Sequence, residues 1–270
     1  MHNWTIVDHI YIYDATIEGL LTIVYKCIQD KELAKLITTE NNHIPNLLDR
    51  PIYIKTDLEK AKDLLEEIEY QISPLTLYYL FTAFKSGRTD KEDIIARYLI
   101  YGFKYGSTIN EMLHNEWVYE VQQLCQQVKC DAHKLIGFLR FNQIANDYLY
   151  AEYESEHDII EYLAQHFKVR LPNETWIIHD RNREKISLYS KGDLAIVDAS
   201  EFKIPTNYND EYVGLWKQYF KDISIKEREN RRCQKNFMAR KYWKYMVELE
   251  GENEYAKKNI KRKRSTKRIS

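Results

Sequence analysis

The stretch YLYAEYESEHDIIEYLAQHFKVRLPNETWIIH, from Tyr148 to His179, decides the fold class of this chain. Tyr148 to Glu154 is rich in aromatic residues and predicts a strand. Ser155 then caps a predicted helix, whose apolar residues recur at helical spacing through Phe167. Thr175 to His179 predicts a second strand. A helix between two strands in so short a run indicates that this half of the chain contains a sheet.

Further strand patterns flank this stretch on both sides. Leu135 to Ile144 predicts a strand that is joined to Tyr148 to Glu154 by a hairpin turn at Ala145-Asn146-Asp147. Downstream, Lys185 to Tyr189 and Leu194 to Val197 each follow a polar or glycine-containing turn. Together with the strand that precedes them, these two runs predict an antiparallel meander.

The first 132 residues predict mainly helices, after one strand at Thr5 to Tyr13 that is rich in β-branched and aromatic residues. A second helical region follows Pro205 and runs from Asp210 to about Glu250. The expected helix starts are Asp14 or Thr16 before Ile17 to Ile28, the capping-box pairs Thr56 with Glu59 and Thr89 with Glu92, Ser73 with Pro74, and Asn115.

We therefore expect an α+β fold with a helical N-terminal half and an antiparallel or mixed sheet in the second half, framed by C-terminal helices. Residues 1–250 are expected to form a single α+β domain, helix-rich over 1–132 and sheet-bearing over 133–250. Residues 251–270 hold many cations and few apolar residues, and they predict a basic, disordered tail.

The composition is that of a globular protein, with 44% apolar and 30% charged residues in a chain of 270. The first residues lack the basic start and the apolar run of a signal peptide. No stretch approaches the roughly 20 apolar residues of a membrane span. The four cysteines form no C-x-x-C pair, and the glycines form no phosphate-binding loop. We therefore expect a cytoplasmic protein without membrane contact, disulfide, cofactor or metal.

The C-terminal part of the chain is basic, although the whole chain has a formal net charge of −1. From residue 221 onward there are 17 Lys and Arg against 7 Asp and Glu, whereas the first 220 residues hold 23 against 34. The stretch LWKQYFKDISIKERENRRCQKNFMARKYW, from Leu215 to Trp243, interleaves cations with aromatic residues. Cations neutralise phosphates and flat rings stack on bases, so this stretch predicts a nucleic-acid-binding surface.

The aromatic residues of this stretch could equally belong to the core, and the acidic first part of the chain could dock the basic segment intramolecularly. Arg140 stands beside Phe138 on a predicted strand face, where it could stack on a base or bind a phosphate. Alternatively, it could pair with Glu152 or Glu154. The candidate nucleic-acid contacts are Arg140, Arg170, Arg228, Arg240, Lys241 and Trp243.

A second group of candidates lies at a predicted strand end. His179 and Asp180 end this strand and Arg183 follows, so the three could form an acid/base pair with an anion clamp, assisted by His157 or His166. The alternative is a capped hairpin turn with surface charges. A metal site of the three histidines is disfavoured, because His157 and His166 would point to different faces of one helix.

Several sequence blocks, in order and over about 240 residues, are similar to those of a known family. The blocks are YDATIEGLL (Tyr13 to Leu21), Thr56-Asp57, Ala83-Phe84, GFKYG (Gly102 to Gly106), HKLIGFLRF (His133 to Phe141), YAEYE (Tyr150 to Glu154), His157-Asp158, HFKVRLP (His166 to Pro172), WIIHDRNR (Trp176 to Arg183) and Leu215 to Trp243. The chain resembles a family of bacterial proteins described as acting in DNA metabolism or DNA repair, whose domain otherwise has no assigned function. It departs from the family pattern at Ser155 and Ala239, where proline is usual.

The resemblance implies a role in DNA repair together with a radical-SAM DNA modification or repair protein, beside which members of the family are encoded. Some members are fused to a uracil-DNA-glycosylase-like domain. The iron–sulfur cluster would belong to the radical-SAM partner, because this chain lacks a three-cysteine cluster motif.

Three functional hypotheses follow. The leading one is a DNA-repair protein that binds nucleic acid and a radical-SAM partner. The second is an enzyme that processes damaged DNA or a nucleotide through His179, Asp180 and Arg183. The third is a protein scaffold, whose acidic body docks a partner while the basic segment folds back on that body.

Overall fold

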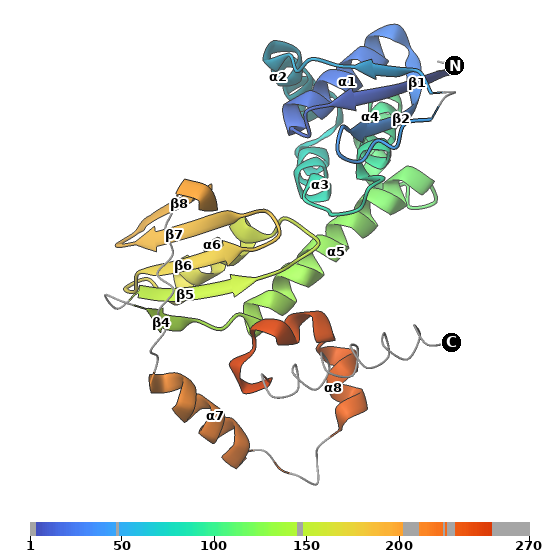
Figure 1. Cartoon of the computed structure of the whole chain (residues 1–270). Helices are drawn as coiled ribbons and strands as arrows, with labels where there is room; N and C mark the ends of the chain where they lie inside the picture. Colours follow the sequence, from blue (N-terminus) through green and yellow to red (C-terminus); the bar gives the residue numbers. More distant parts are fainter. Residues whose placement is uncertain are drawn as a thin grey trace, which may run out of the picture. The chain divides into compact units, whose positions relative to one another are not determined.

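The computed structural model describes residues 4–46, 49–144, 148–201, 211–223, 225 and 230–249 of the chain (Figure 1). The predicted disordered tail, residues 251–270, lies outside these ranges. The chain divides into two compact units, residues 1–130 and 131–270. Each unit combines helices with a sheet, so the predicted α+β class is confirmed.

The first unit contains a parallel three-stranded sheet, with β1 (Thr5–Tyr13) between β2 (Glu32–Thr39) and β3 (Pro51–Tyr53). β1 occupies the predicted residues, but β2 and β3 were not predicted. β2 follows the helix α1 (Ile17–Asp30) after one left-handed residue, Lys31. Strands that are reached through a crossover helix are covered by helices, so their sequences need not alternate between polar and apolar residues.

Helices make up the rest of the first unit, and several begin at predicted residues. The Thr16 hydroxyl accepts a hydrogen bond from the Gly19 N–H (3.0 Å) and caps α1. Ser73 and Asn115 are the side-chain acceptors at two later helix starts, as predicted. The further helices are α2 (Leu58–Glu67), a π-helical turn over Ile68–Ile72, α3 (Pro74–Phe84), α4 (Lys91–Tyr105), a 3₁₀ turn over Gly106–Glu111, and α5 (Glu116–Phe138).

The two predicted capping boxes are wrong. α2 is capped by Asp57 and not by Thr56, whose hydroxyl donates to Asp14 (2.7 Å). At the start of α4, Glu92 is buried and accepts a hydrogen bond from the Tyr13 hydroxyl (3.3 Å). In both cases the side chain that was expected to take part in the cap is hydrogen-bonded instead to Tyr13, the last residue of β1, or to Asp14, which follows it.

Helix α5 extends further than predicted. It ends at Phe138, so the strand expected over Leu135 to Ile144 is wrong for its first residues, and the strand β4 covers only Asn142–Ile144. Leu135 and Leu139 are both buried and lie four residues apart, which is the spacing of one helix face. This apolar run therefore belongs to the buried face of a helix end.

The second unit is built on a mixed sheet with the strand order β4-β5-β6-β7-β8 (Figure 1). Its elements after β4 are β5 (Tyr148–Tyr153), α6 (Ile160–Arg170), β6 (Trp176–Asp180), β7 (Lys185–Ser190) and β8 (Asp193–Asp198). β6, β7 and β8 are antiparallel, so the predicted meander is confirmed. The β4–β5 pair is antiparallel, as a hairpin requires, but its predicted turn at 145–147 lies outside the described residues. β5 and β6 are parallel, with the helix α6 between them in the chain.

The C-terminal region that was predicted to be helical, from Asp210 to about Glu250, consists of several short elements in its described part. It contains α7 (Glu211–Ile223), α8 (Arg231–Phe237) and two 3₁₀ turns, over Arg240–Tyr245 and Val247–Leu249. Across the described part of the chain, no helix is both long and apolar enough to cross a membrane.

A small apolar cluster anchors the end of this segment. Trp243, Met246 and Leu249 are buried and pack against the partly buried Phe138 and Met238. The two 3₁₀ turns are therefore held to the end of α5 by the burial of these apolar side chains.

Candidate functional site

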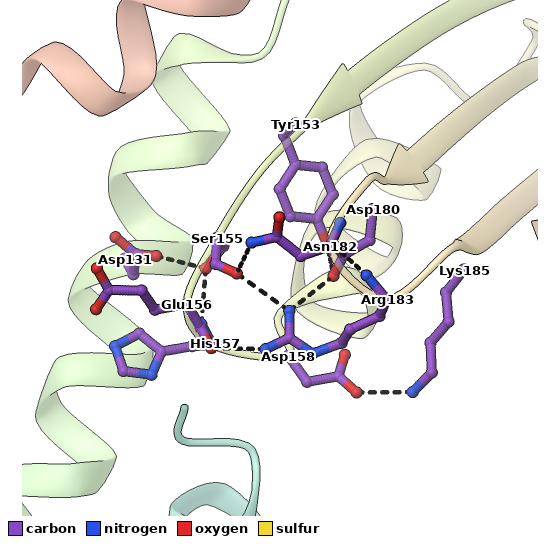
Figure 2. Close-up of polar contacts among 10 residues, drawn as sticks. All are labelled: Asp131, Tyr153, Ser155, Glu156, His157, Asp158, Asp180, Asn182, Arg183 and Lys185. Atoms are coloured by element: carbon purple, nitrogen blue, oxygen red, sulfur yellow. Dashed lines mark hydrogen bonds and ion pairs between the residues drawn. The ribbon is translucent and has the colours of Figure 1, made fainter. Parts of the chain in front are cut away.

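The parallel strands β5 and β6 end side by side at Tyr153 and Asp180, which are register partners. Ligands often bind at the carboxyl ends of parallel strands. The loops that follow, 154–159 and 181–184, bring polar side chains together at this end of the sheet (Figure 2). We define the strand-end cluster as Asp131, Tyr153, Ser155, Asp180, Asn182 and Arg183.

Asp180 is fully buried at the centre of the strand-end cluster. Its Oδ1 accepts hydrogen bonds from the backbone N–H groups of Asn182 (3.0 Å) and Arg183 (3.3 Å). Its Oδ2 accepts from the Tyr153 hydroxyl (3.2 Å) and from the Arg183 guanidinium (3.1 Å). Burial, with the neighbouring Asp180 charge, raises the pKa of Tyr153. Asp180 thus closes the turn between β6 and β7, and its carboxylate is fully hydrogen-bonded.

Arg183 joins this turn to the loop that follows β5. Its guanidinium donates to the carbonyls of Ser155 (3.2 Å) and Glu156 (2.6 Å), in addition to Asp180. The Asn182 side chain donates to the same Ser155 carbonyl (2.8 Å). Figure 2 shows these groups converging on one loop. An anionic ligand would have to displace these bonds, so in this conformation Arg183 holds the loop and is not an open anion clamp.

His179 lies on the other face of the sheet from Asp180, because side chains alternate along a strand. Its ring is buried, with the Tyr150 hydroxyl 2.9 Å from Nδ1 and a Glu184 carboxylate oxygen 3.2 Å from Nε2. The structure therefore brings Asp180 and Arg183 together but separates them from His179.

The two assisting histidines are also apart. His157 is buried in the loop after β5, and its backbone N–H donates to the Ser155 hydroxyl (3.0 Å). Burial lowers the pKa of His157, although the carboxylates of Asp131 and Glu156 oppose this shift. His166 is exposed on α6, which begins after His157, so the expectation that both share one helix is wrong.

Metal binding was not expected from the sequence. Within the described ranges, no group of three or more His, Cys, Asp or Glu side chains could hold a metal ion.

Asp131 is the member of the strand-end cluster that sequence reasoning missed. Its carboxylate accepts hydrogen bonds from the hydroxyls of Ser155 (2.6 Å) and Tyr242, and the Lys241 ammonium lies 3.3 Å away. Burial works to raise the pKa of Asp131, but these hydrogen bonds and the lysine outweigh it and lower the pKa. No local pattern points to Asp131, because the two hydroxyl partners lie 24 and 111 residues away.

Ser155 therefore does not cap a helix as predicted. Its hydroxyl bridges Asp131 on α5 and the backbone of His157, and α6 begins five residues later, at Ile160. The loop after β5 is thus tied to α5, to the β6–β7 turn and, through Asp131, to the C-terminal 3₁₀ turn.

Arg140 has a carboxylate partner, but it is neither of the two that were considered. Its guanidinium donates to the largely buried Glu248 (2.8 and 3.2 Å), and its centre lies 5.8 Å from the ring centroid of Trp216. The predicted alternative of Glu152 or Glu154 is wrong, because the residue lies just after α5 and not on a strand.

The remaining nucleic-acid candidates fall into two groups. Trp243 is only 5% exposed, and its indole N–H donates to the Met238 carbonyl (3.0 Å), as the core alternative predicts. Arg170 and Arg240 are exposed, and the Lys241 side chain beside Asp131 is 43% exposed. Arg228 lies outside the described residues.

α7 carries an exposed apolar stripe, and its residues were not placed on one helix face from the sequence. Leu215, Tyr219 and Ile223 recur every four residues and share one helix face. With the adjacent Trp216, they are all exposed, and we call these four residues the α7 stripe. Phe237 on α8 is more exposed still. Apolar and aromatic residues that remain exposed at regular helical spacing indicate a binding surface.

Comparison with protein families places these features in one family. A family model described as a domain of unknown function, DUF4130, matches residues 89–248, which is more than half of the chain. A search of curated proteins finds no match. The matched range includes the strand-end cluster, the whole five-stranded sheet, and α7 and α8. The chain therefore belongs to the DUF4130 family.

Proposed function

We propose that this protein acts in DNA repair or DNA metabolism by binding nucleic acid through its C-terminal segment, residues 211–249. The observation that carries the proposal is the exposure of aromatic rings close in sequence to exposed cations. Trp216 and Tyr219 on α7 are 39% and 54% exposed. Arg232 and Arg240, further along the same segment, are exposed as well. Exposed rings stack on unpaired bases and guanidinium groups contact phosphates, which favours a single strand.

The charge distribution supports the same proposal. The sequence of α8, RRCQKNF, holds three cations and no carboxylate, within a part of the chain where Lys and Arg outnumber Asp and Glu by 17 to 7. The acidic first 220 residues repel a polyanion, so its approach would be directed toward the C-terminal segment. Binding that depends on such charges releases counterions and weakens as salt rises.

Other cations of the segment hold it in place. Lys244 forms an ion pair with Glu154, whose carboxylate also accepts a hydrogen bond from the Tyr245 hydroxyl (2.8 Å). The hydrogen bond from Lys244 lowers the pKa of Glu154 more than burial raises it. Together with the ion pair between Lys241 and Asp131, this pair holds the 3₁₀ turn over Arg240–Tyr245 against the end of α5 and the loop after β5. We infer that these two lysines hold the C-terminal segment in place, and that the exposed arginines contact the nucleic acid.

The proposal is tested by fluorescence anisotropy with labelled single-stranded and double-stranded oligonucleotides. The intact protein should bind at about 50 mM salt, and log affinity should fall linearly with log salt by roughly 0.7–0.9 for each phosphate neutralised. Replacing Trp216 and Tyr219 together with Ala should weaken binding to the single strand by about tenfold or more, since each stacked base contributes roughly 1–3 kcal/mol. Tyr70→Ala, at an exposed tyrosine of the first unit, is the matched control.

Two outcomes would overturn the proposal. One is the absence of binding to either oligonucleotide by the folded protein at low salt. The other is an affinity that the Trp216/Tyr219 double variant and Tyr70→Ala change to the same extent.

The α7 stripe favours a protein partner as a second candidate function. Leu215 and Ile223 are aliphatic and exposed, and their side chains carry neither an aromatic face for stacking nor a group that can pair with a phosphate. Apolar residues repeated along one helix face are the pattern with which a helix docks into a partner groove. The radical-SAM repair protein implied by the resemblance is the partner to test.

Size-exclusion chromatography of the two proteins mixed at micromolar concentration should show one joint peak. Leu215→Gln should abolish that peak, whereas Val169→Gln, at an exposed apolar position on α6, should not. Separate peaks with and without DNA would count against the partnership.

A further inference from the structure

The first unit contains a cavity of about 360 Å³ that belongs to none of the sites above. It lies at the amino ends of β1 and β2, against one side of α4 and the start of α5. Four segments that are distant in sequence therefore build it. The described lining residues are Trp4, Ile6, Leu33, Arg97, Ile100, Tyr101, Lys104 and Trp117.

The lining combines three aromatic residues with two cations, and the described lining residues include no carboxylate. Leu33 and Ile100 are buried and form an apolar part of the wall, while Ile6 is mostly exposed. Aromatic rings and aliphatic groups accept a flat, weakly polar ring system, and cations accept an anion. A ligand that satisfies both halves of this lining carries an aromatic ring and a negative charge.

Arg97 is held in position for such a ligand. Its Nε donates to Asp93 (2.7 Å), and its guanidinium centre lies 4.9 Å from the centroid of the Trp117 ring. Among the described residues, Asp93 is the one hydrogen-bond partner of Arg97, and that bond uses Nε. The two terminal amino groups of Arg97 can therefore still donate, and a guanidinium fork matches the oxygens of a phosphate.

Lys104 is the second-last residue of α4 and lies one turn beyond Ile100 and Tyr101. Its ammonium lies 5.9 Å from the ring centroid of Tyr101 and 5.0 Å from that of Tyr105, which stack on each other. In the described part of the chain, no carboxylate forms an ion pair with Lys104. Its charge is thus available beside two aromatic rings.

We propose that this cavity binds a single nucleotide, with the base against the aromatic lining and the phosphate on Arg97 and Lys104. A volume of about 360 Å³ is at the lower end of the roughly 300–1,000 Å³ of small-molecule sites, which suits one nucleotide better than a dinucleotide. The nucleotide could be a free mononucleotide or an unpaired nucleotide of a strand. The site is independent of the C-terminal surface, so either proposal can fail alone.

The first experiment measures binding to the full chain by titration calorimetry, with tryptophan fluorescence as a second readout. Nucleoside 5′-monophosphates should bind at least about tenfold more tightly than the matching nucleosides, inorganic phosphate or ribose 5-phosphate. Equal affinity for nucleoside and nucleotide would overturn the role of the cations. No binding of any monophosphate at about 1 mM would overturn the site itself.

Variants of Ile6 place a charge in the cavity without disturbing the core, because this side chain is exposed. Ile6→Glu should weaken nucleotide binding by about tenfold or more through repulsion of the phosphate, whereas the neutral, similarly sized Ile6→Gln should have little effect. Lys104→Gln should also weaken binding, and Lys62→Gln, at an exposed lysine of α2, should not. Equal affinities for Ile6→Glu and Ile6→Gln, in proteins with unchanged thermal melts, would contradict the proposal.

A last comparison identifies the source of the nucleotide. A short single-stranded oligonucleotide is added to the Trp216→Ala/Tyr219→Ala protein, in which the proposed C-terminal surface is impaired. Competition between the oligonucleotide and the monophosphate supports a strand as the source. Binding of the monophosphate without such competition supports a free nucleotide. Both results retain the cavity as the site, provided that Ile6→Glu weakens the binding and Ile6→Gln does not.

Discussion

The strand-end cluster and the α7 stripe both contain groups that commonly bind ligands, but they differ in how far the rest of the chain covers those groups. Asp180 and Arg183 satisfy each other, and Arg183 also binds two main-chain carbonyls. Trp216 and Tyr219 instead keep 39% and 54% of their surface exposed. The comparison shows that a charged group at a strand end serves the fold when its hydrogen bonds are filled from within the chain, and that an exposed ring remains able to bind a partner.

The same distinction divides the cations of the C-terminal segment. Lys241 and Lys244 face Asp131 and Glu154, so their charges are compensated within the second unit. Arg232 and Arg240 are exposed. Fewer cations can therefore contact a phosphate than the net positive charge of this segment suggests, because Lys241 and Lys244 are paired with carboxylates of the chain.

The largest effect is expected from Asp180→Ala. This change leaves the Arg183 guanidinium without its buried carboxylate and should lower the free energy of unfolding by about 3–5 kcal/mol. Urea unfolding followed by circular dichroism measures it, and Asp193→Ala, at an exposed carboxylate on β8, is the control. A folded Asp180→Ala protein of normal stability that has lost its function in a DNA-damage survival assay would instead support the enzymatic hypothesis.

Two tryptophans sharpen the comparison between buried and exposed rings. Trp243→Ala removes a buried ring from a small cluster and should cost about 3 kcal/mol or more of stability. Trp216→Ala should change stability far less and should weaken binding to single-stranded DNA. Thermal melts and anisotropy on both proteins separate the effects. If Trp243→Ala melts like the wild type but binds DNA poorly, the assignment of Trp243 to the core is wrong.

The next effect depends on pH. Because burial lowers the pKa of His157 in the folded state, the unfolded chain takes up a proton more readily. Above pH 6.5, roughly the pKa of His157 in the unfolded chain, the imidazole is neutral in both states and the free energy of unfolding does not depend on its titration. Below that pH the unfolded chain binds the proton more readily than the folded protein, so the free energy of unfolding should fall as the pH decreases. In His157→Asn this loss between pH 7 and 5 should be smaller, while His166→Asn, at an exposed histidine, should follow the wild type. Parallel curves for all three proteins would contradict the burial argument.

The smallest effect is expected from Lys244→Gln. Its ion pair with Glu154 is about half-exposed, so the loss of the pair should cost about 0.2–1 kcal/mol of stability, and this cost should decrease as salt is added. A charge swap, Lys244→Glu with Glu154→Lys, should restore part of the loss. If Lys244→Gln lowers the free energy of unfolding by several kcal/mol, and high salt does not reduce this effect, the pair is not a weak surface ion pair and the prediction is wrong.

Short sequence patterns correctly predicted those strands and helix starts that depend on residues close together in the chain. β1, the Thr16 cap of α1 and the Ser73 start of α3 all lie where the pattern placed them, since each depends on residues within a few positions. The sheet-bearing second half was predicted for the same reason. β2 was missed because a strand covered by helices lacks the alternation that identifies a half-exposed one.

The candidate site was predicted less well than the fold. His179 and Asp180 are neighbours in sequence and were predicted to act together, but adjacent residues on a strand point to opposite faces of the sheet. The helix assumed for His157 begins only at Ile160, so its spacing from His166 carried no information on geometry. Periodicity defines a face only within an element whose bounds are right.

The amino-acid sequence by itself determined the α+β class, the strand-bearing second half, and the contrast between an acidic first part and a basic C-terminal part, because each follows from composition or from short-range pattern. Only the tertiary structure decided which charges are used internally. Asp131 meets Tyr242 across 111 residues, and Arg140 meets Glu248 across 108. The packing of segments that are distant in sequence brings such partners together. The burial that shifts a pKa, and the ion pair that engages an arginine, exist only once that packing has formed.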